Sequence, residues 1–176
     1  MGHALVAGSE PASWRRRRTL PQHEFIEETR DLTRVNQLVA AATESWGLSD
    51  RVRRLSLPSL LYNQDDLEHM TILVAQNHEC CDIAVALWEP AAGWEALPGF
   101  NTALLHGLYV VPCGQGTGVG SRLLTTVCEQ MSNSGFESVV GKVWRSADRF
   151  FSQRGFAPVD RNADQQAYPR FMARYL

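Results

Sequence analysis

A glycine-rich turn between an apolar segment and a helical segment constrains this chain more than any other feature of its sequence. The apolar run 102–111 is followed by four glycines within residues 114–120, and apolar residues then recur at helical spacing over 119–131. A strand that enters a helix through such a turn aims backbone N–H groups at one point, which is the geometry that binds phosphate. The sequence therefore predicts a ligand that carries phosphate.

Two common phosphate-binding loops do not fit the spacing of this turn. A Walker A loop ends in Gly-Lys-Ser/Thr, and the turn has no lysine at its end. The dinucleotide pattern G-x-G-x-x-G, started at Gly114 or Gly116, ends on Val119 or Ser121 instead of glycine. A nucleotide-binding protein of either type is therefore disfavoured.

Length and composition favour one folded domain preceded by a short arm. A chain of 176 residues is long enough for one core, whereas residues 1–20 mix Gly, Ser, Pro and Arg without periodicity. We expect a flexible arm over residues 1–20 and a single domain over residues 21–176. The formal net charge is −2, and the run Arg15–Arg18 is typical of a solvated tail. Neither nucleic acid nor a membrane is therefore an expected partner.

The sequence also bears on location and on metal binding. Its apolar runs are far shorter than the roughly 18 residues that span a bilayer, and its start lacks the order of segments found in a secretory signal. We therefore expect a cytoplasmic protein. The four cysteines include the adjacent pair Cys80 and Cys81 but no C-x-x-C spacing, so no metal site is expected.

The periodicity along the chain predicts a mixed α/β domain with a partly antiparallel sheet. Asp31 is expected to cap a helix that ends near Gly47, and the stretch 47–57 is expected to connect it to a second, shorter helix within 58–69. Later helices are expected from 119 to Gly135 and from 146 to 154. Strands are expected at 24–29, 70–76, 81–88, 102–111, 137–143, 156–159 and 167–175.

The spacing Gln115-x-x-Gly118-x-Gly120 resembles the [RQ]-x-x-G-x-[GA] signature of the GNAT superfamily of acyl-CoA-dependent N-acyltransferases. The segment 147–156 is similar to the A-x-x-F-Y-x-x-x-G-F segment of the same family. The resemblance implies the GNAT fold, a central mixed and mostly antiparallel twisted sheet of six to seven strands with about four helices. It further implies acetyl-CoA as the co-substrate.

The resemblance also implies which residues bind coenzyme A. The main chain of the strand before the turn would pair with the pantetheine arm, and the turn would hold the pyrophosphate, where side chains would obstruct the close approach of the backbone. The expected cofactor-binding residues are Leu108, Tyr109, Val110, Gln115, Gly116, Thr117, Gly118, Val119, Gly120, Ser121 and Phe151.

His106 is the candidate general base for attack by an amine. The imidazole of a histidine titrates near neutral pH, and strand alternation is expected to place His106 on one face with Leu104 and Leu108. The strand resembles the L-H-x-L-x-V strand of aralkylamine N-acetyltransferases, in which a histidine at this place serves as base. A partly buried structural histidine remains the alternative.

The general acid is less well marked, because Phe151 stands where many family members carry a tyrosine. Tyr109, Ser146 and Ser152 are the candidate substitutes, and Tyr109 is taken with His106 as the predicted catalytic pair. A coenzyme A thiolate can leave without a dedicated acid, because a thiol pKa of about 8.5 makes it a tolerable leaving group.

The expected function is transfer of an acetyl group from acetyl-CoA to a primary amine by direct attack in a ternary complex. The acceptor would be a small-molecule amine or a protein or peptide amine. The sequence is also compatible with a homodimer. The alternative is a coenzyme A-binding regulatory or interaction module with little or no activity, which Phe151 and Trp144 would allow because they replace a tyrosine and an asparagine of the family pattern.

Overall fold

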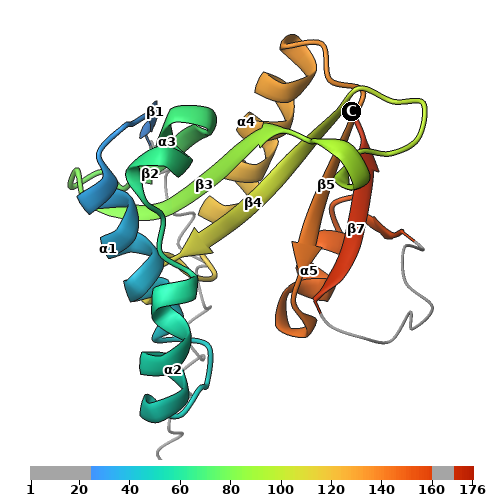
Figure 1. Ribbon diagram of the computed structural model, residues 1–176. Coiled ribbons are helices and arrows are strands. Elements are labelled where there is room, and N and C mark those ends of the chain that lie inside the picture. The colour runs from blue at the N-terminus through green and yellow to red at the C-terminus, as the bar shows by residue number, and fades with distance from the viewer. Residues whose placement is uncertain (1–24, 160–168) are drawn as a thin grey trace, which may run out of the picture.

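Seven strands form one mixed sheet in the computed structural model, which describes residues 25–159 and 169–176 (Figure 1). The strand order is β1-β2-β3-β4-β5-β7-β6, and β4 and β5 are the parallel pair in an otherwise antiparallel sheet. The prediction of a mixed, mostly antiparallel sheet of six to seven strands is confirmed. The strands are β1 (Phe25–Glu28), β2 (Thr71–Gln76), β3 (Asp82–Pro90), β4 (Thr102–Val110), β5 (Ser138–Val143), β6 (Ala157–Pro158) and β7 (Arg170–Tyr175).

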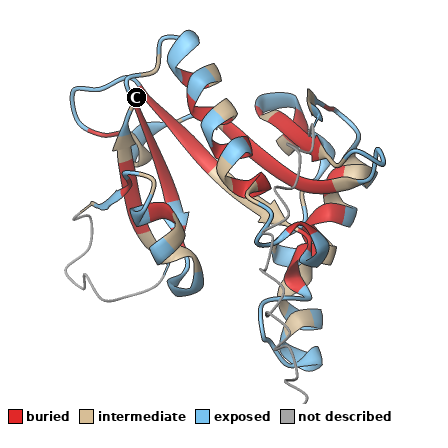
Figure 2. Ribbon diagram, turned by 180° about the vertical axis from the view of Figure 1, so that it is seen from behind, coloured by how far each residue is buried: buried red, intermediate tan, exposed pale blue. Residues whose placement is uncertain are grey.

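Helices cover both faces of the sheet. α1 and α3 lie on one face of the β2–β4 region and α4 lies on the other, where it carries a continuous buried stripe (Figures 1 and 2). The expected arm of residues 1–20, with Arg15–Arg18, lies outside the described residues. The helices are α1 (Leu32–Thr43), α2 (Asp50–Ser56), α3 (Gln64–His69), α4 (Val119–Asn133) and α5 (Asp148–Ser152), with short 3₁₀ turns at 57–59, 93–95, 112–114 and 145–147.

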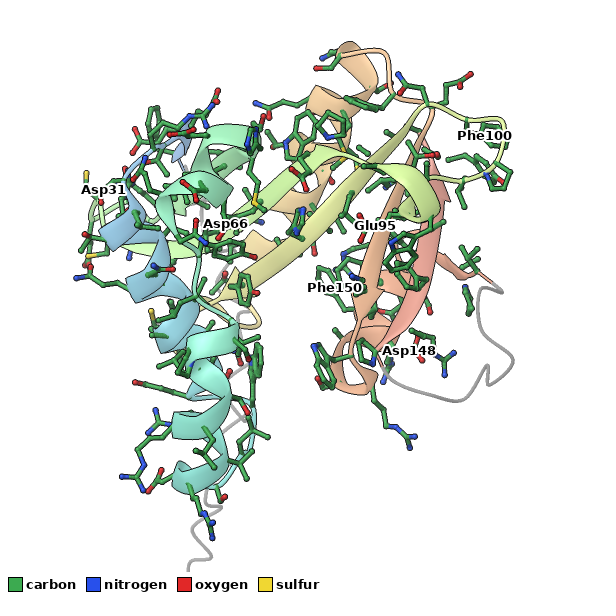
Figure 3. All side chains as sticks on the ribbon, viewed as in Figure 1. Asp31, Asp66, Glu95, Phe100, Asp148 and Phe150 are labelled. Atoms are coloured by element: carbon green, nitrogen blue, oxygen red, sulfur yellow. The ribbon has the colours of Figure 1, made fainter. Side chains whose placement is uncertain are left out.

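The beginning of α1 follows from its capping residue, as predicted. The carboxylate of Asp31, labelled in Figure 3, accepts a hydrogen bond from the Arg34 backbone N–H at 3.0 Å. The buried residues then follow the helical period and pack against β3 and β4; they are Val35, Leu38, Val39, Ala42 and Thr43. Gly47, at φ +66°, follows the end of the helix.

The prediction for the stretch 47–57 was wrong, because most of it forms α2. The Ser49 hydroxyl accepts a hydrogen bond from the Val52 backbone N–H at 3.4 Å, and Asp50 lies in the first turn. None of the residues of α2 is buried, and the helix points away from the sheet (Figure 1). A helix held by its cap and without a buried face leaves no apolar stripe in the sequence to predict it.

The sheet divides where β4 and β5 separate. Their pairing begins at Thr102 opposite Ser138 and stops at Leu105 opposite Gly141, whereas β4 continues to Val110. On the side of β5, the backbone of residues 106–110 therefore has no strand partner. The two strands meet near the C-terminal end of the chain and diverge from there (Figure 1). The consequence is a gap within the sheet whose walls are strand edges.

A β-bulge in β4 lies at the start of this gap. Leu87 pairs with Gly107 and Trp88 pairs with Leu105, so His106 is the extra residue in the strand. The bulge also changes which side chains share a face. Leu108, which pairs with Ala86, lies on the face of Leu105, and Leu104 lies on the opposite face. The expected common face of Leu104 and Leu108 is therefore wrong, because strict alternation does not continue through a bulge.

Candidate functional site

The glycine turn is an open cradle at the N-terminus of α4. Gly118 is the N-cap in the left-handed region, at φ +93°, and Gly116 lies at φ +76°. Among the described residues, the backbone N–H groups of Gly116 and Gly118 donate no hydrogen bond. Unpaired amides beside the positive end of a helix of 15 residues favour an anion.

Two other glycines serve packing instead. A Cβ on Gly120 would lie 3.2 Å from Val110 Cγ2, and a Cβ on Gly114 would lie 3.1 Å from the Ile83 carbonyl oxygen. The turn itself is stabilised by Thr117, whose hydroxyl donates to the Gly114 carbonyl oxygen at 2.7 Å. The glycines thus divide into a pair that opens the turn and a pair that lets the turn and the start of α4 pack closely against the sheet.

The side chain of Gln115 lines the same pocket as Gly116 and Gly118, and its amide group is already hydrogen-bonded within the protein. Its amide nitrogen donates to the Val110 carbonyl oxygen at 3.1 Å and to the Ser45 hydroxyl just beyond α1. This contact joins the cradle to the end of α1. Direct binding of a phosphate by the Gln115 side chain stays a prediction.

Arg154 completes one wall of the cradle, although no motif in the sequence marks it as a site residue. It lines the same pocket as Gly116 and Gly118. Its guanidinium carbon lies 3.7 Å from the centroid of the Phe150 ring, and its Nη1 donates to the Phe150 carbonyl oxygen at 2.7 Å. Its Nε donates to the Ser121 hydroxyl at 3.1 Å. An arginine directly before Gly155 was the available signal, although nothing in the sequence shows that it reaches α4.

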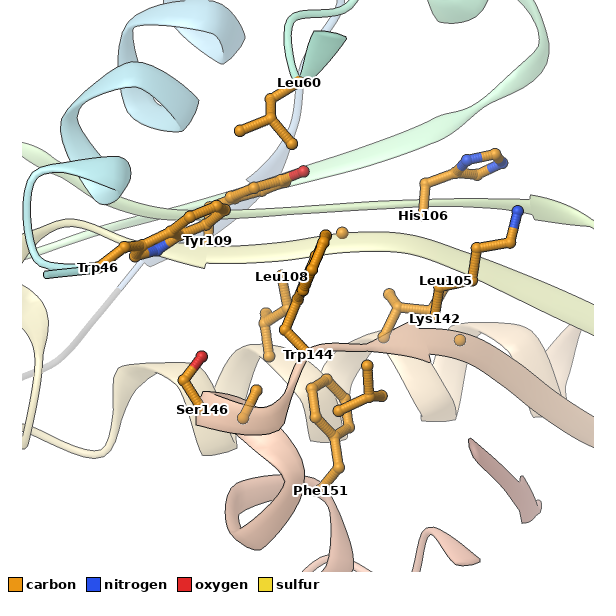
Figure 4. A pocket seen from close by; sticks show the side chains of 14 residues that line it. Trp46, Leu60, Leu105, His106, Leu108, Tyr109, Lys142, Trp144, Ser146 and Phe151 are labelled. Carbon is orange, nitrogen blue, oxygen red and sulfur yellow. The ribbon is translucent and has the colours of Figure 1, made fainter. Parts of the chain in front are cut away.

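A pocket of about 160 Å³ opens between β4 and β5, in the gap described above (Figure 4). The β4 wall includes residues from Leu105 to Tyr109, and the β5 wall includes Gly141 to Val143. The remaining lining residues are Trp46 and Leu60 from the segments around α2, and Trp144, Ser146, Ala147 and Phe151 from the segment around α5. The pocket therefore joins residues from both parts of the sheet.

Aromatic side chains form the end of the pocket nearest α1. The rings of Trp46 and Tyr109 stack at 6.3 Å with an interplanar angle of 13°. The hydroxyl oxygens of Tyr109 and Tyr62 lie 3.5 Å apart. Burial raises the pKa of both phenols above its ordinary value. Both hydroxyls are therefore protonated at neutral pH and able to donate hydrogen bonds.

His106 lines this pocket and is paired with a carboxylate. Its Nε2 lies 2.7 Å from Glu89 Oε1, and each of the two side chains is 26% exposed. Lys142, on the opposite wall, has its Nζ 3.3 Å from Glu95 Oε1 and lies over the Trp94 ring. No local pattern in the sequence predicts the role of Glu89, because its partner is 17 residues away on the neighbouring strand.

The segment around α5 supplies no phenol. Phe151 is 8% exposed, and its ring packs edge to face against Phe150 and Phe156 at 5.2 and 5.1 Å. Ser146 lines the pocket, whereas Ser152 is exposed and does not. Of the three substitute acids, the structure therefore brings Tyr109 and Ser146 to the pocket.

In the ranges 25–159 and 169–176, no three His, Cys, Asp or Glu side chains are grouped as metal ligands would be. Over the same ranges, no helix has the length and apolar character needed to cross a membrane. All four cysteines are free, and three of them are exposed.

The model of the acetyltransferase (GNAT) family matches residues 50–156, which is more than half of the chain. The chain belongs to the GNAT acetyltransferase family. The prediction of an acyltransferase with acetyl-CoA as co-substrate is thereby confirmed at the level of the family. No curated protein matches the sequence.

Solved structures of acetyltransferases share this fold at low sequence identity. The PaiA N-acetyltransferase of Thermoplasma acidophilum, solved in complex with coenzyme A, has a TM-score of 0.68 and 16% identity over 86% of this chain and 99% of its own. A GNAT acetyltransferase of Staphylococcus aureus Mu50 has a TM-score of 0.61 and 16% identity, over 86% and 98%. An IAA acetyltransferase of Bacillus cereus has a TM-score of 0.60 and 16% identity, over 87% and 99%.

Proposed function

We propose that this GNAT protein transfers an acetyl group from acetyl-CoA to a primary amine, by direct attack while both substrates are bound. The observation that carries the proposal is the placement of two features on one strand. β4 ends in a cradle of free glycine amides, and the same strand borders a pocket in which His106 is paired with Glu89. A phosphate anchor and a candidate base are thus joined by an open strand edge.

The residues at the cradle fit coenzyme A. The amides of Gly116 and Gly118 and the positive end of α4 would receive the pyrophosphate, and the Arg154 guanidinium adds positive charge to the wall. Thr117, Val119, Gly120 and Ser121 shape the turn and the first turn of α4, and Gln115 links the turn to α1. On the side of β5, the backbone of Leu108, Tyr109 and Val110 has no strand partner and suits the amides of the pantetheine arm, with the Val110 carbonyl oxygen already held by Gln115. Phe151 forms an apolar wall.

His106 would take the proton from the attacking nitrogen. A free alkylamine has a pKa of about 10, so most of it is protonated and unreactive at pH 7. Acetyl-CoA supplies the thioester whose carbonyl carbon accepts the nitrogen. As the C–N bond forms and the C–S bond breaks, the proton leaves the nitrogen for the imidazole, and the thiolate departs. Backbone N–H groups along the open part of β4 can stabilise charge on the carbonyl oxygen.

Tyr109 is the proposed hydroxyl donor at the site. Its raised pKa keeps the phenol protonated but also makes it a weak acid. It therefore serves better as a hydrogen-bond donor than as an essential proton source. A thiol with a pKa of about 8.5 leaves without such a source.

Phe151 favours a second candidate, a coenzyme A-binding module with little turnover. The buried Phe151 ring has no hydroxyl with which to protonate the departing thiolate, as the tyrosine of many family members does. Both candidates bind coenzyme A, so turnover separates them.

The acceptor class also stays a proposal and covers small-molecule amines and protein or peptide amines. The sequence alone supports a cytoplasmic location and is compatible with a homodimer.

The test is a ligand panel followed by an activity assay. Thermal unfolding should shift upward with acetyl-CoA and with coenzyme A but not with NAD or ATP. Release of free thiol should then require both acetyl-CoA and a primary amine. Stabilisation by NAD alone contradicts the proposed function, and stabilisation by coenzyme A without thiol release across a broad amine panel favours the binding module.

A further inference from the structure

We propose that Glu89 is a positioning residue for the reaction, acting through His106 by fixing the tautomer and orientation of its imidazole. This inference rests on the proposed function, in which His106 takes the proton from the amine. Glu89 does not line the pocket, so its effect on the reaction would pass through the histidine.

The geometry of the pair comes from the β-bulge. Glu89 pairs with Leu104 in the regular part of the ladder, and His106 is the extra residue two positions further along β4. The bulge directs the imidazole toward the Glu89 side of the sheet, where Nε2 meets Oε1 at 2.7 Å. A regular strand would leave the orientation of the imidazole to its own rotamers. Here the carboxylate fixes it.

The chemistry of the contact determines the tautomer. An ionised carboxylate only accepts hydrogen bonds, so the Nε2 of His106 must carry the hydrogen. In the neutral imidazole this leaves the lone pair on Nδ1, which is then the basic nitrogen. When Nδ1 takes the proton from the attacking amine, the imidazolium lies against the negative charge of Glu89. Glu89 stabilises that charge through the contact with Nε2.

The other charged group on this pocket is already paired. From β5, Lys142 lines the same pocket, and Glu95 lies 3.3 Å from its ammonium. From β4, Tyr109 contributes a phenol that is neutral at the working pH. Among the described residues, Glu89 is thus the carboxylate in contact with His106.

The experiment compares Glu89→Gln with a matched control. Glu27→Gln removes a glutamate of similar exposure, 35%, from the edge strand β1, where it pairs with Arg34 at 2.6 Å. For Glu89→Gln we expect kcat to fall at least about tenfold, because general-base catalysis contributes about 10²–10⁴ in rate and depends on the correct tautomer. KM for acetyl-CoA should stay within about twofold, because the cradle is untouched.

The pH profile distinguishes a positioning role of Glu89 from a purely structural one, because a purely structural role would leave the profile unchanged. Loss of the negative charge beside the imidazolium should shift the acid limb of the kcat/KM profile to lower pH in Glu89→Gln but not in Glu27→Gln. Glu89→Asp, which keeps the charge, should retain the wild-type limb. Circular dichroism and thermal unfolding confirm that each variant is folded.

A fourth variant, His106→Asn, separates failure of this inference from failure of the proposed function. If His106→Asn keeps full activity, the base assignment itself is wrong. If His106→Asn loses activity while Glu89→Gln matches Glu27→Gln in both kcat and pH profile, then His106 acts without Glu89, and the positioning role is overturned.

Discussion

Replacing Gly118 by alanine tests the cradle directly, because one methyl group acts on both stability and binding. Gly118 lies at φ +93°, and an alanine Cβ there would lie 2.9 Å from Arg122 Nη1, the movable end of a flexible side chain. The left-handed conformation costs an L-residue about 1–2 kcal/mol. For a chain of this size, we expect the melting temperature to fall by about 2–4 °C per kcal/mol.

The same methyl group stands at the approach to the free amides. Loss of one hydrogen bond between an amide and a charged phosphate corresponds to about 1.5–3 kcal/mol. Each 1.4 kcal/mol is a factor of about ten in affinity. We therefore expect KM for acetyl-CoA to rise about 10- to 100-fold, with kcat at saturation little changed.

Gly135 at the other end of α4 provides the control for this prediction. It lies at φ +85°, and a Cβ there meets nothing within 4 Å. Gly135→Ala should therefore show a similar loss of melting temperature with an unchanged KM. Steady-state kinetics and thermal unfolding on the two variants check both quantities. Equal KM values in Gly118→Ala and Gly135→Ala would refute the assignment of the cradle as the phosphate site.

Three further predictions concern the acceptor side, the core and pH dependence. Trp46→Ala should raise KM for the amine several-fold and leave KM for acetyl-CoA unchanged in steady-state kinetics, because Trp46 stacks on Tyr109 at the end of the pocket away from α5. Leu123→Ala, at a fully buried position of α4, should lower the free energy of unfolding by about 2–5 kcal/mol in urea titrations. The Arg34 guanidinium holds the pKa of Asp82 below its usual range, so this carboxylate stabilises the fold at neutral pH, and the stabilisation is lost as the pH falls through the folded-state pKa. Thermal unfolding of Asp82→Asn should accordingly differ most from the parent near neutral pH, and the difference should shrink in acid.

Local signals in the sequence were sufficient for most of the fold. The Asp31 cap, the buried period of α1 and α4, and the turn glycines Gly47 and Gly135 each act within a few residues, so the elements they define were predicted close to their observed bounds. α2 was missed because a helix with no buried residue has no apolar period to detect.

The site depended on contacts that no local pattern reports. The bulge at His106 arises from the register of β3 against β4, and it reverses the face expected for Leu108. Glu89 meets His106 across strands, and Arg154, just beyond α5, meets Ser121 of α4. The glycine spacing predicted the cradle, because that geometry is set within seven residues of chain. The partner of the histidine could come only from the three-dimensional structure.

The separation of β4 from β5 leaves part of β4 without a neighbouring strand on one side. A ligand arm bound along residues 106–110 would complete that ladder, and a ligand that binds only the native state stabilises it by about 2.7 kcal/mol at a concentration 100 times its Kd. The resistance of this protein to unfolding and to proteolysis would then rise and fall with the supply of its co-substrate. An opening in the sheet would thereby couple the lifetime of the protein to a metabolite pool.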